Sequence, residues 1–94
     1  MKVFWTPEAI NDRSDVFDYI TVDNPGAAAR MDELFAEAAA RLAEHPLLGK
    51  PGKISGTREV IPHESYRLVH EVGDEIVWIL ALIHTARRWP PLRE

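Results

Sequence analysis

The chain has 94 residues, an apolar fraction of 46%, no cysteine and a net charge of −4. Its length suits one domain spanning residues 1–94, and its composition excludes intrinsic disorder, disulfides, a thiolate nucleophile and a cysteine-ligated zinc site. The acidic total disfavours tight nonspecific nucleic-acid binding, and the lack of a long apolar run or a signal-peptide pattern predicts a cytoplasmic protein with no membrane partner.

The first two predicted elements are a strand and a helix. Lys2–Trp5 is short and apolar, which is typical of a strand. Thr6-Pro7-Glu8 then indicates a helix start, with a hydroxyl cap, a proline in the first turn and an acid at the positive end of the helix dipole. Helical spacing of apolar residues continues to about Val22, through Ala9, Ile10, Val16, Phe17 and Ile20.

A second helix is predicted from Pro25 to Glu44. Asn24-Pro25 repeats the start signal, and His45-Pro46 ends the helix. Because little more than Asp23-Asn24 joins the two helices, they should form an antiparallel hairpin. The predicted buried stripe of the second helix consists of Ala28, Met31, Phe35, Ala38 and Leu42.

Three more strands follow a loop. Leu47–Ser55 contains two glycines and a proline and is predicted to be a loop. The strands are predicted at Thr57–Ile61, Tyr66–Val72 and Glu75–His84, with no regular structure after Trp89-Pro90-Pro91. The order β-α-α-β-β-β predicts an α+β fold in which the helical hairpin packs on one face of a small, mainly antiparallel sheet.

The last two strands are expected to pair through a two-residue turn at Gly73-Asp74. This turn pairs Val72 with Glu75 and places His84 opposite His63. A register error of one residue would exchange the two faces of the sheet. With side chains alternating, one face is expected to hold Arg58, Arg67, Trp78 and His84.

This predicted convergence suggests phosphodiester chemistry. RNA cleavage by a 2′-hydroxyl needs a base, positive charge near the phosphate and an acid for the leaving oxygen. Arg58 and Arg67 are predicted to supply the charge and His84 to transfer the proton, with His63 as its partner. Glu59 is expected on the opposite face, so no carboxylate obviously joins them.

Further basic residues are predicted to contact substrate phosphates, namely Lys50 and Lys53 in the loop and Arg87 and Arg88 near the end of the last strand. Ordinary structural roles compete with these assignments: the arginines can form salt bridges, a strand-end histidine can bond to backbone, and a basic tail can be solvated. The sequence has no metal-ligand spacing and no phosphate-binding loop, so neither a metal nor a cofactor is expected.

Taken in order, several segments resemble the RelE/ParE superfamily of toxins from bacterial type II toxin–antitoxin modules. The resemblance covers nearly the whole chain, and it implies the same β-α-α-β-β-β fold. It is carried by Trp5-Thr6-Pro7-Glu8-Ala9, Asp18-Tyr19-Ile20, Asn24-Pro25, Ala27-Ala28, His45-Pro46, Gly49-Lys50-Pro51-Gly52, Gly56-Thr57-Arg58-Glu59, Tyr66-Arg67-Leu68-Val69, Ile83-His84 and Trp89-Pro90.

The resemblance implies a toxin that is held inactive by a cognate antitoxin protein. RelE-like members cleave mRNA on the ribosome, and ParE-like members inhibit DNA gyrase without nuclease residues. Arg67 and His84 look like the arginine and histidine of YoeB-type nucleases, although Thr85 stands where those carry a tyrosine and their glutamate has no clear match. Ribosome-dependent mRNA cleavage is the expected activity. The alternatives are non-catalytic gyrase inhibition and an inactivated toxin that still binds its antitoxin.

Overall fold

The computed structural model describes residues 1–90 and contains two helices and five strands. The order agrees with the predicted β-α-α-β-β-β fold, with a two-residue strand added inside the predicted loop. The segment after Trp89-Pro90-Pro91, which was predicted to lack regular structure, lies outside the described residues. The elements are β1 Lys2–Trp5, α1 Pro7–Thr21, α2 Pro25–Glu44, β2 Lys50–Pro51, β3 Arg58–His63, β4 Tyr66–Val72 and β5 Ile76–His84.

Both helices begin at the predicted caps. Thr6 Oγ1 accepts a hydrogen bond from the backbone N–H of Ala9 at 3.1 Å, and Asn24 Oδ1 accepts one from Ala27 at 3.0 Å. A proline occupies the first turn of each helix, where its missing N–H has no intrahelical role. Within residues 1–90, no helix is long and apolar enough to cross a membrane.

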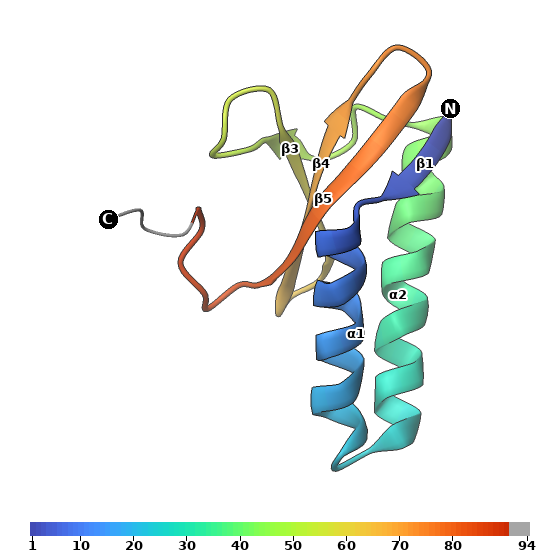
Figure 1. The fold of residues 1–94 in the computed structure, drawn as a ribbon, viewed down its shortest axis with the longest axis vertical. Helices are drawn as coiled ribbons and strands as arrows, with labels where there is room; N and C mark the ends of the chain where they lie inside the picture. The colour runs from blue at the N-terminus through green and yellow to red at the C-terminus, as the bar shows by residue number, and fades with distance from the viewer. Residues whose placement is uncertain (91–94) are drawn as a thin grey trace.

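The strands form one five-stranded sheet in the order β1-β5-β4-β3-β2. β1 runs parallel to β5, and the other neighbours are antiparallel. The helical hairpin covers one face of this sheet, while the β2–β3 loop and residues 85–90 extend on the other side (Figure 1). We call the face under the helices the front face and the other the back face.

The core lies between the helices and the front face. The predicted stripe of α2 is confirmed there, with Met31 partly buried and its other members buried. α1 buries Ala9 but leaves Ile10 and Phe17 exposed, at 54% and 38% of their surface. The buried residues of this front-face core are Ala9, Phe35, Ala38, Ala39, Leu42, Tyr66, Leu68, Val77, Ile79 and Leu82.

The β4–β5 hairpin differs from the predicted register. Gly73 N–H donates to the carbonyl of Ile76 at 2.7 Å, so the turn is one residue later than the predicted Gly73-Asp74 turn. A β-bulge then follows, because Val69 pairs with Ala81 while His70 pairs with Ile79, which leaves Leu80 as the extra residue. Beyond this bulge the alternation of β5 is inverted relative to the prediction.

The start of α1 bonds to the backbone around the bulge. Thr6 Oγ1 donates to the carbonyl of Leu80 at 3.4 Å, and Asp12 Oδ2 accepts from the N–H of Leu82 at 3.0 Å. β1 ends at Trp5, opposite Ile79, so it supplies no strand partner at these positions. The side chains of α1 therefore replace the missing strand and stabilise the irregular part of β5.

The β3–β4 register is also shifted by one residue from the prediction. Arg58 pairs with His70, not with Val69 as predicted, and Glu59 takes the position opposite Val69. Since directly paired residues share a face, Glu59 lies on the back face with Val69.

We predict that Asp12→Ala lowers the free energy of unfolding by about 1–3 kcal/mol, because it leaves the partly buried N–H of Leu82 without its acceptor. Asp15→Ala, which removes an exposed carboxylate from the same helix, should change it by less than about 0.5 kcal/mol. Urea unfolding followed by circular dichroism measures both. Equal values for the two variants would contradict the assigned role of Asp12.

Candidate functional site

The structure divides the predicted catalytic residues between the two faces of the sheet. Arg67 pairs with Ile83, which belongs to a small back-face cluster. His84 pairs with Tyr66, whose ring contacts Phe35 of α2 at 5.3 Å between centroids. The predicted convergence of the arginines and His84 on one face is therefore wrong: the bulge at Leu80 separates Arg67 from His84, and the shifted β3–β4 register separates Arg58 from Arg67.

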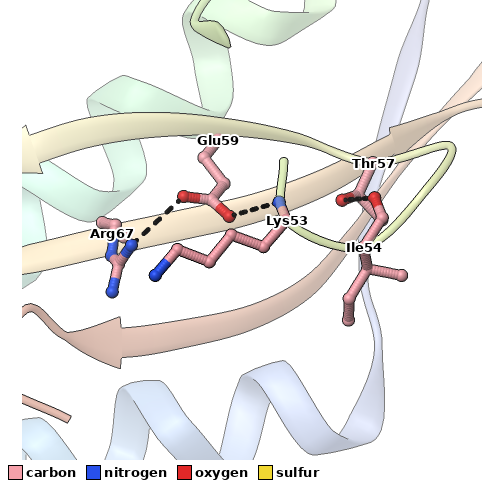
Figure 2. Close-up of polar contacts among 5 residues, drawn as sticks. All are labelled: Lys53, Ile54, Thr57, Glu59 and Arg67. Carbon is pink, nitrogen blue, oxygen red and sulfur yellow. Dashed lines mark hydrogen bonds and ion pairs between the residues drawn. The ribbon is translucent and has the colours of Figure 1, made fainter. Parts of the chain in front are cut away.

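On the back face, Arg67 forms an ion pair with Glu59 (Figure 2). Nη1 of Arg67 lies 3.5 Å from Oε1 of Glu59, and the second carboxylate oxygen accepts the backbone N–H of Lys53 at 3.2 Å. Glu59 is 2% exposed, and Nε of Arg67 is buried without a hydrogen-bond partner in residues 1–90. Glu59 was expected on the opposite face, and its position beside Arg67 corrects that expectation.

A tight loop between β2 and β3 brings Lys53 to this pair. Thr57 Oγ1 donates to the carbonyl of Ile54 at 2.6 Å, and Gly52 N–H donates to the carbonyl of Thr57 at 2.8 Å. A Cβ atom at Gly52 would lie 2.3 Å from Thr57 Oγ1, so this close approach needs glycine. In Figure 2 the side chain of Lys53 points along Glu59 toward Arg67.

Arg58 lies on the opposite face of β3 from Glu59, where it hydrogen-bonds to the segment that follows α2. Its Nη2 donates to the carbonyl of Gly49 at 2.9 Å, and its Nε donates to the carbonyl of Leu48 at 3.4 Å. Backbone carbonyls therefore take up part of the hydrogen-bonding capacity of the Arg58 guanidinium.

Lys50 is exposed and lines a surface hollow of about 440 Å³ with Arg41 of α2.

His70 is fully buried beside this segment, which the sequence pattern did not lead us to expect. Its Nε2 lies 2.9 Å from the carbonyl oxygen of Pro46, and its Nδ1 has no partner in the described part of the chain. Burial, and to a lesser extent the charge of Arg58, lower the pKa of His70, while the bond to Pro46 acts in the opposite direction. The available signal was the alternation along β4, which places His70 on the same face as Tyr66 and Leu68.

His63, Tyr66 and His84 form one row across β3, β4 and β5. Tyr66 pairs with both histidines, so the predicted direct pairing of His63 with His84 is wrong. The ring centroids lie 6.4 Å and 5.3 Å from that of Tyr66. Nδ1 of His63 accepts the N–H of Ser65, and Nδ1 of His84 accepts that of Ala86, both at 3.0 Å. The neutral rings therefore carry their proton on Nε2.

The tail after β5 returns over the back face (Figure 1). Trp89 packs against the cluster of Val69, Ala81 and Ile83, and its Nε1 is buried without a partner in residues 1–90. Arg87 and Arg88 are exposed in the segment that leads to Trp89. Across the same residues no group of three or more potential metal ligands gathers.

Comparisons with known proteins agree on the type of protein. A family profile described as ParE toxin of type II toxin-antitoxin system, parDE, matches residues 3–89. Y4kP of Sinorhizobium fredii, classed as a candidate toxin, is 32% identical over 95% of this chain and 93% of that protein. Toxin RelE2 of Caulobacter vibrioides is 35% identical over 92% of this chain and 97% of that protein.

Solved structures share the fold. A chain of the chromosomal ParDE TA system from P. aeruginosa superposes with a TM-score of 0.78 and 20% identity, over 89% of this chain and 95% of that one. The YoeB/ParE toxin from Agrobacterium tumefaciens gives a TM-score of 0.64 and 17% identity, over 89% and 98%.

We predict that His70 makes stability depend on pH near neutrality. Its folded-state pKa lies below the ordinary value of 6.5, so the unfolded chain binds the proton more readily. The stabilisation is fully present above about pH 6.5 and is lost as the pH falls through the lowered pKa of the folded state.

The measurement is the free energy of unfolding between about pH 7.5 and about pH 5. His70→Gln, whose amide can still donate to Pro46, should lose less stability over this range than the wild type. The control is His45→Gln at an exposed position, which should keep the wild-type dependence. A wild-type slope in His70→Gln would assign the effect to other groups.

Proposed function

We propose that this chain is the toxin of a type II toxin–antitoxin module and that it inhibits DNA gyrase by binding it. The chain belongs to the ParE toxin family of such systems. The observation that carries this choice is the separation of Arg67 from His84. The first is held on the back face by buried Glu59, and the second lies at the end of β5 beside Tyr66. A binding protein needs no reacting centre, so this separation is compatible with gyrase inhibition.

A nuclease needs a closer arrangement. The phosphate, the attacking hydroxyl and the leaving oxygen must each lie within hydrogen-bond reach of a catalytic group, about 2.6–3.2 Å. Arg67 is 13% exposed at its side chain and already faces an anion, and Arg58 donates to the carbonyls of Leu48 and Gly49. The charge that was expected to stabilise a cleaved phosphate is thus engaged within the protein.

Ribosome-dependent mRNA cleavage is the second candidate, and the row of His63, Tyr66 and His84 favours it. The row places two imidazoles on either side of one phenol, and His84 is exposed. Burial raises the pKa of the Tyr66 phenol, with a smaller contribution from Tyr19, so the phenol stays protonated at neutral pH. In this alternative the histidines transfer protons and the exposed Lys50, Lys53, Arg87 and Arg88 contact the message or the ribosome.

The proposed partner is a cognate antitoxin, acting in the cytoplasm. Ile10 and Phe17 expose apolar surface on α1 and line a hollow of about 370 Å³ together with the ion pair of Arg13 and Asp32. Arg13 donates two hydrogen bonds, at 2.6 Å and 2.9 Å, to the carboxylate of Asp32 and lowers its pKa. An amphipathic antitoxin segment would cover this apolar surface.

We predict that Phe17→Asp weakens antitoxin binding by about tenfold or more, because it places a charge in the covered apolar surface. The binding partner is the product of the adjacent gene, and calorimetric titration measures the affinity. Val22→Asp serves as the control, since Val22 is 82% exposed just after α1. An unchanged affinity in folded Phe17→Asp would remove this face of α1 from the interface, and failure of the neighbouring product to bind would contradict the toxin–antitoxin assignment.

We predict that the purified protein inhibits gyrase supercoiling and leaves a ribosome-bound message intact. Supercoiling assays and primer extension measure the two activities side by side. His84→Gln should not change gyrase inhibition, because no proton is transferred. Site-specific cuts in the message that disappear in His84→Gln, whose rate would fall by about 10²–10⁴ if His84 transfers a proton, would overturn gyrase inhibition and establish the second candidate.

A further inference from the structure

The carboxylate of Glu59 is contacted by the kinds of donor that usually bind a ligand anion. One carboxylate oxygen faces the guanidinium of Arg67 and the other accepts the backbone N–H of Lys53. These two donors come from different elements, β4 and the β2–β3 loop, and they meet the carboxylate from two sides (Figure 2). Guanidinium and loop N–H groups are the donors that proteins commonly use for phosphate oxygens.

The carboxylate satisfies these donors incompletely. Both interactions are long, at 3.5 Å and 3.2 Å, whereas charge-assisted bonds are usually about 2.7–2.9 Å. Nε of Arg67 is buried and unpaired within residues 1–90. An anion with more oxygens than a carboxylate would have additional acceptors to offer at this position.

The surroundings of the pair favour a polyanion. Lys53 is exposed and its side chain points toward Arg67 in Figure 2. The tail carries exposed Arg87 and Arg88 to the same face through the packing of Trp89. These cations belong to the same face as the pair of Arg67 and Glu59, whose charges cancel.

We propose that Glu59 is an internal counter-anion that occupies a phosphate site on the back face and prevents it from binding the phosphodiester backbone of nucleic acid. The site consists of Arg67 and the cationic side chains of Lys53, Arg87 and Arg88, while the N–H of Lys53 holds the side chain of Glu59 in place. Glu59 thereby acts as a specificity-determining residue: with its charge present, the back face excludes nucleic acid, and with its charge removed, Arg67 and the cations near it attract a phosphate. This inference does not depend on whether gyrase or the ribosome is the target.

The test is Glu59→Gln, which keeps the size and the acceptor for Lys53 but removes the charge. The probe is a fluorescent single-stranded RNA of about 12 nucleotides, titrated at several salt concentrations. Affinity should rise by about tenfold or more, and the salt slope should steepen by about 0.7 for each additional phosphate that the protein neutralises. The double variant Glu59→Gln with Arg67→Gln should return to the wild-type affinity.

Glu71→Gln is the matched control, because it makes the same change in net charge at an exposed position on β4. If Glu59→Gln and Glu71→Gln increase RNA affinity equally, the effect is one of net charge and the proposal is overturned. It is also overturned if the higher affinity survives Arg67→Gln, or if folded Glu59→Gln binds no better than the wild type.

Titration with inorganic pyrophosphate distinguishes a site for a single phosphate group from a surface that binds several phosphates of a nucleic-acid backbone. An increased affinity for pyrophosphate as well as for RNA identifies an isolated phosphate site, and an increase for RNA alone identifies a track for several phosphates; either result supports the role of Glu59. Should Glu59→Gln fail to fold, the wild type provides the second measurement. The buried Nε–H resonance of Arg67 should not move on addition of pyrophosphate, and a saturable shift would show that Glu59 does not block the site.

Discussion

The bulge at Leu80 determines which residues this protein presents on each face of its sheet. Before the bulge, Val77 and Ile79 face the helices; after it, Ala81 and Ile83 face away, although simple alternation would have continued the first pattern. The irregular backbone persists because α1 binds it through Thr6 and Asp12. The position of α1 is thus coupled to the placement of His84, because both depend on the same few hydrogen bonds.

Local signals were sufficient for the elements of the fold. The Thr6 and Asn24 caps, the proline in each first turn and the apolar stripe of α2 each act within a few residues, so sequence spacing predicts them directly. The pairing of strands depends instead on residues distant in the chain. The bond from Leu82 to Asp12 joins residues 70 positions apart, and no pattern within β5 indicates it.

The candidate site was predicted less well for the same reason. The one-residue difference in the β3–β4 register was enough to exchange the faces of Arg58 and Glu59, and the bulge in β5 was enough to place His84 on the other face from Arg67. Arginines, lysines and histidines were expected to gather around β3 and β4, but the carboxylate of Glu59 was not expected among them. Their grouping also differs from the prediction: a charged pair forms on the back face, and an aromatic row forms at the end of the strands. Sequence reasoning about sites in small sheets is therefore limited by register more than by residue type.

The parallel pairing of β1 with β5 has a consequence for the synthesis of the protein. Residues 2–5 find their partners in residues 76–79, so the first strand emerges from the ribosome long before the strand beside which it must lie. Until then the helical hairpin has no complete sheet to cover, and long-range pairings of this kind form late in folding. An unfinished chain thus lacks both the back face and the histidine row. A chain interrupted before β5 can therefore form neither the pairing of β1 with β5 nor the row of His63, Tyr66 and His84.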